Sequence, residues 1–335
     1  MNSISELSSI VLILSQLKGI GATFIKKHLD IISNNRFHWT DSTTEKSVTN
    51  FLHLTNRNYS SSEIQEAILK AEDILTECES NKIGLISIAE KNYPTKLLEI
   101  KDPPPILFFI GDLSLLNLNA ITIIGTRKPN DNGKVIAERI GKHFASRGWV
   151  ICNGLADGID TYSILNQEEF CFAKVVGVVG SGLTRSAFRS LPKQSTINID
   201  FILDCGGLVL SEMPPSKKQD TFSVVKSCRI QAGIGIGLIL VQSSLEGGSK
   251  FTVKAAVDSD RPLGVVYPVK LDINRDDYTA NRKIIESGVR GLGEFVELKK
   301  SRSSHPKIVV LSGKDSYPEF ESAMEQSNQV FALSI

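Results

Sequence analysis

Short apolar runs alternate with helical stretches from residue 83 onward, and this alternation constrains the fold of the 335-residue chain more than any other feature. Several runs, such as KVVGVVG and LILV, have no polar side. Strands that alternate with helices form parallel sheets, whose strands are covered on both faces. The sequence therefore predicts an α/β fold with a doubly wound, mostly parallel sheet. Its expected strands are 83–88, 106–109, 120–125, 150–153, 175–179, 207–210, 238–242 and 263–267.

The first 75 residues lack such runs, and their apolar residues recur at helical spacing. Within them, LKGIGATFIKKHL (17–29) places a Gly-Ile-Gly turn between two helices, which is typical of a helix-hairpin-helix, SAM-like or related small module. The hairpin amides can face a DNA phosphate, with Lys26 and Lys27 assisting. The alternative is a plain corner of two helices with a glycine cap and surface lysines. We predict a small all-helical domain over 1–75.

The remaining segments follow from composition. Residues 80–298 hold the predicted sheet, and the basic, polar stretch LKKSRSSHPK predicts a linker over 299–306. After it, IVVLSG, a helical stretch and QVFALSI predict a short β-α-β extension over 307–335.

Charge and cysteine usage limit the classes of partner. The net charge is only +1, so any anion site must come from local clustering. Residues 124–147 supply such a cluster, with six basic and two acidic side chains. The five cysteines are scattered without a Cys-x-x-Cys pair, which argues against a zinc site or a disulfide framework. No apolar run approaches the roughly 20 residues that span a bilayer. We expect a cytoplasmic protein with no membrane contact.

The turn Gly125-Thr126-Arg127 follows an apolar strand, at the point where open α/β sheets collect ligands. Gly125 permits close backbone approach, and the Arg127 guanidinium can donate two hydrogen bonds to one phosphate. The turn lacks the phosphate-loop lysine and the spacing of the dinucleotide fingerprint. A second glycine-bearing turn, NGLADGID (153–160), comes one strand later. Together the turns predict a phosphate-binding cleft.

These turns and further motifs resemble the DNA-processing protein A family (DprA or Smf), a Rossmann-like branch of the SLOG superfamily. That family has a Gly-Thr/Ser-Arg turn and then a Ser-Gly-Leu-Ala-x-Gly-Ile-Asp turn. The likeness runs in order from 83 to 298. Its other segments are KNYPTKLLEIKDPPPILFFIGD (91–112), GVVGSGL (177–183), GGLVLSEMPP (206–215), FSVVKSCRIQAGIGIGLILVQ (222–242), EGGSKFT (246–252) and ANRKIIESGV (280–289).

The resemblance implies a Rossmann-like domain that binds single-stranded DNA, hands it to a RecA-type recombinase and forms a homodimer. By residue match, Arg127 and Arg229 would bind phosphates. Lys226 would replace the family's first arginine, where this chain has Ser227, and Lys250 would assist. The predicted nucleic-acid-binding residues are Gly125, Thr126, Arg127, Lys128, Gly154, Lys226, Arg229, Gly248, Ser249 and Lys250.

The chain also departs from the family pattern. Ile164 stands where the family has a histidine, Asp157 precedes Gly158, and Gln242 replaces a strand-end acid. A winged helix is not recognisable in 307–335. These departures lead to the hypothesis of a specialised paralogue in a phage-defence or mobile-element context, with a defence-system partner protein.

The sequence contains no recognisable catalytic constellation, metal-ligand spacing or cofactor fingerprint, so we expect a binding protein without metal or cofactor rather than an enzyme. The loop acids Asp157, Asp160, Glu212 and Glu246 could act as acid or base groups. The competing interpretation makes them helix caps or turn residues. Asp160 in particular fits a capping or turn-fixing role.

Two other functions remain open. LEGGSKFT is also similar to the phosphate turn of phosphoribohydrolases in the same superfamily, which favours a nucleotide-sensing or nucleotide-processing protein. In that case the acids matter more than the basic surface. The third possibility is a scaffold that docks a partner through its N-terminal helices or C-terminal unit.

Overall fold

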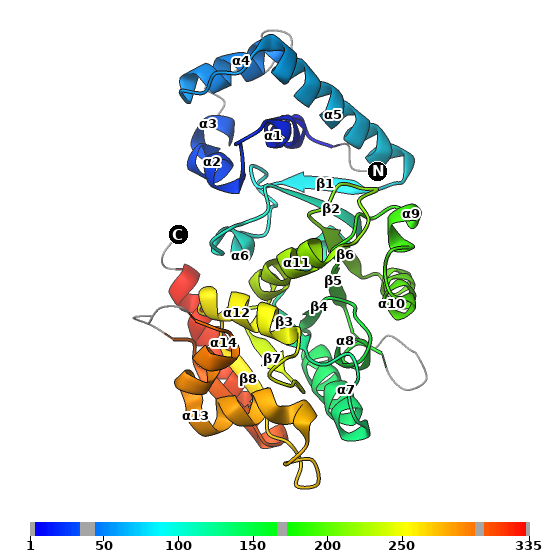
Figure 1. The fold of residues 1–335 in the computed structure, drawn as a ribbon, viewed down its shortest axis with the longest axis vertical. Helices are drawn as coiled ribbons and strands as arrows, with labels where there is room; N and C mark the ends of the chain where they lie inside the picture. The colour runs from blue at the N-terminus through cyan, green and yellow to red at the C-terminus, as the bar shows by residue number, and fades with distance from the viewer. Residues whose placement is uncertain (1–3, 34–43, 166–172, 299–304, 333–335) are drawn as a thin grey trace.

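The computed structural model describes residues 4–33, 44–165, 173–298 and 305–332, and these build one α/β sheet with flanking helices (Figure 1). The strands in chain order are β1 (Gly84–Ser87), β2 (Ile106–Gly111), β3 (Ala120–Ile124), β4 (Val150–Asn153), β5 (Val175–Val178), β6 (Leu208–Ser211), β7 (Leu238–Leu240), β8 (Leu263–Val266) and β9 (Ile308–Leu311).

The described strands lie side by side in the order β1-β2-β6-β5-β4-β3-β7-β8-β9. From β6 to β9 every neighbouring pair is parallel, while β2 is antiparallel to both β1 and β6. All residues of β3 to β8 are buried, which explains their mostly apolar sequences. The predicted α/β, Rossmann-like, mostly parallel sheet is confirmed.

Helices connect the strands and cover the sheet. Figure 1 shows α11 and α12 beside each other in front of the strands. No helix of the described segments has both the length and the apolar character needed to cross a bilayer. The helices after β1 are α6 (Thr95–Leu98), α7 (Asp131–Ser146), α8 (Ile159–Tyr162), α9 (Arg185–Phe188), α10 (Lys193–Asp204), α11 (Thr221–Ile234), α12 (Ser249–Asp258), α13 (Thr279–Phe295) and α14 (Tyr317–Ala332).

The N-terminal segment is helical and sits at the β1 end of the sheet (Figure 1). Its last helix continues to Ser80, beyond the predicted boundary at residue 75. At the Gly-Ile-Gly hairpin, Lys26 Nζ donates to Leu98 O at 2.6 Å and the Tyr59 hydroxyl donates to Lys18 O at 2.7 Å. These contacts favour the corner of two helices, because Lys26 is engaged in holding the segment against α6. Its helices are α1 (Glu6–Gln16), α2 (Ala22–Lys27), α3 (Leu29–Ser33), α4 (Thr44–Leu54) and α5 (Ser61–Ser80).

The C-terminal unit differs from the predicted β-α-β extension. Its strand β9 pairs with β8 and so belongs to the main sheet, and the predicted final strand is wrong because α14 continues to Ala332. Tyr317, Phe320 and Met324 are buried at helical spacing, and no proline or glycine follows them to end the helix. The predicted linker 299–306 lies outside the described residues except for its last two positions.

Candidate functional site

A cleft of about 810 Å³ opens at the carboxyl end of the parallel strands. The turns after β3, β4 and β5 line it with Gly125, Gly154 and Gly180, and the start of α12 lines it with Gly248. The cleft lies beside β3 and β7, where the strand order switches: the chain runs from β3 to β4 toward one edge of the sheet and from β7 to β8 toward the other. Ligands of open α/β sheets bind at this switch in strand order. Seven of the ten predicted binding residues line this cleft: Gly125, Thr126, Arg127, Lys128, Gly154, Gly248 and Ser249.

The Gly125-Thr126-Arg127 turn is fixed by its neighbours. Thr126 N donates to Gln242 O at 2.7 Å, and Ile159 N donates to Thr126 O at 3.1 Å. A Cβ at position 125 would lie 2.6 Å from Cγ1 of Ile159, so only glycine fits there. The backbone of the turn is therefore held in one conformation before any ligand arrives, which lowers the entropic cost of binding.

Arg127 and Lys128 are both exposed at the rim of the cleft. Within the described segments neither side chain forms an ion pair with a carboxylate. An exposed guanidinium without a carboxylate partner can bind an anion without first breaking an ion pair. The predicted placement of Arg127 beside the glycine turns therefore agrees with the geometry.

Asp160 fixes the second turn, as predicted. Its Oδ2 accepts hydrogen bonds from the amides of Gly154 at 3.1 Å and Ala156 at 3.2 Å. Burial raises the pKa of this carboxyl to about 7, although the two amides and the charge of Arg127 act in the opposite direction. Near neutral pH the group is thus partly protonated, so it repels an anion in the cleft less than an ordinary aspartate would.

The start of α12 forms another part of the cleft wall. Gly248 caps the helix without a side-chain hydrogen bond, and the first turn carries no acid. The N-terminus of a helix favours an anion, since its amides and macrodipole carry positive partial charge. Ser249 adds a hydroxyl at the same position.

Phe251, Val224 and Val225 give the cleft an apolar part that sequence reasoning missed. Phe251 is 39% exposed, whereas Val253 and Val257 of the same helix are buried. The available signal was periodicity, because Phe251 lies off the buried stripe of α12 and needs another reason to be aromatic.

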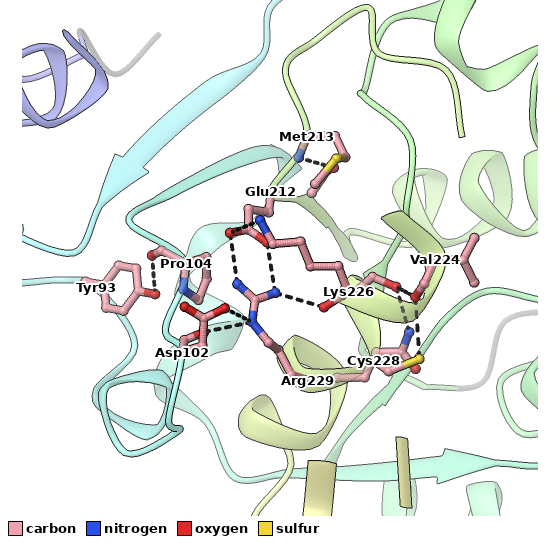
Figure 2. A network of polar contacts seen from close by, with 12 residues as sticks. Tyr93, Asp102, Pro104, Glu212, Met213, Val224, Lys226, Cys228 and Arg229 are labelled. Carbon is pink, nitrogen blue, oxygen red and sulfur yellow. Dashed lines mark hydrogen bonds and ion pairs between the residues drawn. The ribbon is translucent and has the colours of Figure 1, made fainter. Parts of the chain in front are cut away.

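Arg229 does not line the cleft, and its ion pairs weigh against the predicted role as a phosphate binder, which stays a prediction. Its two terminal nitrogens donate to both carboxylate oxygens of Glu212, at 2.8 and 2.9 Å, and its Nε donates to Asp102 O at 2.7 Å (Figure 2). Tyr93 donates to Pro104 O at 2.8 Å and so fixes the same loop. Arg229 is only 16% exposed, and four hydrogen bonds already engage its guanidinium. The pair instead fastens α11 to the end of β6.

The two predicted lysines are also engaged outside the cleft. Lys226 Nζ lies 3.1 Å from Glu212 Oε1, and Lys250 Nζ lies 2.7 Å from Glu297 Oε1. Neither lines the cleft. The Lys250–Glu297 pair has the more exposed carboxylate, because Glu297 is 72% exposed whereas Glu212 is 10% exposed. Exposed ion pairs such as Lys250–Glu297 are weak, so this contact alone does not prevent Lys250 from binding an anion. Like Arg229, both lysines differ from the seven predicted residues that line the cleft by their position outside its lining.

The departures from the family pattern have structural explanations. Ile164 is fully buried, and the Asp157 carboxylate accepts the Gly158 amide at 2.7 Å without lining the cleft. Gln242 is buried, and its Oε1 accepts the amide of Asn130, the cap of α7, at 3.3 Å. These residues support the turns around the cleft rather than face a ligand.

Comparison with known proteins gives consistent matches. The family model described as DNA recombination-mediator protein A matches residues 84–298. The DNA processing protein DprA of Bacillus subtilis is 31% identical over 205 residues, which cover 61% of this chain and 67% of that protein.

Two solved structures share the fold. That of DNA processing protein A from Helicobacter pylori, described with its single-stranded DNA binding mode, is 25% identical with a TM-score of 0.53, covering 62% of this chain and 88% of that one. The X-ray structure of DprA from Streptococcus pneumoniae is 24% identical with a TM-score of 0.59, covering 88% and 98%. Since the family model spans more than half of its residues, the chain belongs to the DNA recombination-mediator protein A family.

Proposed function

We propose that this protein binds single-stranded DNA by gripping the phosphate backbone at the rim of the cleft. One observation carries the proposal: Arg127 stands exposed and without a carboxylate partner in the described residues, beside glycine turns that a Cβ would block. Main-chain amides and a guanidinium bind phosphates without reading bases. Such a site suits a ligand whose sequence varies.

The apolar part of the cleft favours a single strand over a duplex. Phe251 offers a ring face next to Gly248 and Ser249. Stacking of a base on an aromatic side chain contributes about 1–3 kcal/mol and tolerates any base. Only an unpaired base can turn toward such a ring, so a phosphate on Arg127 and a base on Phe251 would select single strands.

The relative from Helicobacter pylori, studied for its single-stranded DNA binding mode, supports the same ligand for this chain. The finer parts of the proposal follow the family resemblance: delivery of the strand to a RecA-type recombinase, action as a homodimer and a cytoplasmic location. Because Ile164, Asp157 and Gln242 depart from the family pattern, the proposal includes the hypothesis of a specialised defence protein.

A nucleotide-sensing or nucleotide-processing protein is the second candidate. The observation that favours it is Asp160, a carboxyl in the cleft whose pKa is raised by burial to about 7 and which could therefore exchange a proton at neutral pH. The two hydrogen bonds that Asp160 accepts from backbone amides instead indicate a turn-fixing role. A binding comparison separates the two functions.

The test compares ligands on the wild-type protein. Fluorescence anisotropy with a labelled oligothymidine of about 20 nucleotides should show saturable binding that weakens steeply with salt, while a duplex of the same length binds more weakly. Thermal shifts with mononucleotides and dinucleotides should be small by comparison. A marked stabilisation by a mononucleotide together with no oligonucleotide binding would replace the proposal with the nucleotide-sensing alternative.

A further inference from the structure

A second hollow, of about 630 Å³, lies on the outer side of α7, away from the cleft described above. One of its walls is the α7 stripe Val135, Arg139, Lys142 and Ser146, and the other is Lys314 in the turn after β9. Residues 135, 139, 142 and 146 share one face because they are three or four apart in a helix. We call this hollow the α7 groove.

The C-terminal unit fixes both walls of the α7 groove. The Tyr317 ring packs on His143 with centroids 4.7 Å apart, and Phe320 packs on Phe144 at 6.5 Å. Glu321 on α14 lies 2.7 Å from Nε of Arg147. Lys314, three residues before the first residue of this helix, lines the same groove as Arg139. The C-terminal unit lies outside the segment 84–298 that matches the family model, whereas α7 lies inside it.

The charge of the α7 groove is positive. Its basic residues are Arg139, Lys142 and Lys314, and its one acid, Glu138, forms an ion pair with Lys142. Arg139 and Lys314 are exposed, and within the described ranges neither forms an ion pair with a carboxylate. One exposed guanidinium and one exposed ammonium group lie on opposite walls of the groove. Such a pair suits a chain of phosphates better than it suits an apolar or a cationic ligand.

Helix α7 links the proposed binding site to the α7 groove, although the two hollows share no lining residue. Helix α7 begins three residues after Lys128, and Lys134 stands in its first turn before Arg139. From Asp131 to Lys142 the helix rises about 16 Å, a distance that a few nucleotides of extended strand can bridge. We propose that a single strand gripped at Arg127 continues along α7 and is bound a second time in the α7 groove through its phosphates.

This inference rests on the proposed function, and oligonucleotide length separates the two. An oligothymidine of about 5 nucleotides fills the cleft alone, and one of about 25 reaches the groove, within the range of site sizes known for single-strand binders. The test variant is Arg139→Gln/Lys314→Gln. Its matched control, Lys46→Gln/Lys70→Gln, removes two exposed charges from α4 and α5, far from both sites in Figure 1.

Anisotropy titrations over a series of salt concentrations give the readout. The groove variant should bind the long oligonucleotide roughly three- to tenfold more weakly, and its slope of log K against log salt should fall by about 1.4, since each lost single-strand phosphate contact contributes about 0.7. Binding of the short oligonucleotide should stay unchanged, and the control should match the wild type on both ligands.

Four other outcomes are informative. Wild-type slopes for the groove variant on the long oligonucleotide would overturn the groove alone. An equal loss on both lengths, or an equal loss in the control, would overturn it as well, because the effect would then be the general field of the protein. Failure of the wild type to bind either length would instead refute the proposed function.

Discussion

Replacing Glu212 by alanine is expected to lower the free energy of unfolding by about 3 kcal/mol, because it leaves the Arg229 charge largely buried without its main partner. Both terminal nitrogens of Arg229 donate to Glu212, and the two side chains are only 16% and 10% exposed. The expected loss of stability is at the lower end of the range for a broken buried pair, because Asp102 Oδ2 remains 3.1 Å from Arg229 Nε. Urea denaturation followed by circular dichroism measures it.

Two further variants separate the stability lost with the Glu212–Arg229 pair from the general effect of removing a carboxylate. Glu66→Ala breaks an exposed pair with Lys70 and should change stability by less than about 0.5 kcal/mol. The double variant Glu212→Leu/Arg229→Met removes both charges and should regain most of the loss. It should also bind single-stranded DNA within about twofold of the wild type, a difference of only about 0.4 kcal/mol. Strong loss of binding in this folded double variant would restore Arg229 as a ligand residue.

Gly158→Ala should destabilise the protein by about 3 kcal/mol and disturb the binding turn at the same time. Gly158 has a φ of +79°, and a Cβ there would lie 2.4 Å from Thr126 O and 2.6 Å from the carbonyl carbon of Arg127. Both contacts are backbone atoms of the first turn, which cannot rotate away. Relief of the clash must therefore move the segment that carries Arg127, so oligonucleotide affinity should fall in parallel.

Gly148→Ala is the matched control for this effect. Gly148 has a similar φ of +83°, but nothing lies within 4 Å of the added Cβ. Its substitution should cost only the backbone strain, about 1 kcal/mol, and leave binding unchanged. If urea denaturation gave equal losses for the two variants, the contact between the turns would not be the cause and this interpretation would be rejected.

The sequence predicted the sheet well because its signals are local. Mostly apolar runs mark β3 to β8, and the glycine turns after β3 and β4 mark the edge where the cleft forms. Arg127 could be placed correctly, since its position in the turn follows from its place in the chain.

The partners of charged side chains could not be predicted in the same way. Arg229 and Lys226 on α11 meet Glu212, which follows strand β6, and Lys250 meets Glu297, almost fifty residues later. A basic residue in a family motif therefore does not reveal whether it faces a ligand or an acid. Similarly, QVFALSI is rich in residues that favour strands, yet α14 continues through most of it. The preceding turns of this helix are already packed against the protein, and a helix that has formed extends easily.

The most direct test of the central claim is the affinity of Arg127→Ala for a single strand. The side chain is exposed and forms no ion pair within the described residues, so the variant should keep wild-type stability. A charge-assisted contact with phosphate contributes about 1.5–3 kcal/mol, so binding should weaken roughly 10- to 100-fold. The slope of log K against log salt should fall by about 0.7.

Arg127→Lys, which keeps the charge but not the planar pair of donors, should retain the wild-type slope and part of the affinity. The decisive result is thus the anisotropy titration of the alanine variant across salt concentrations. The account predicts weaker binding with a shallower slope; an affinity and a slope equal to those of the wild type would contradict it.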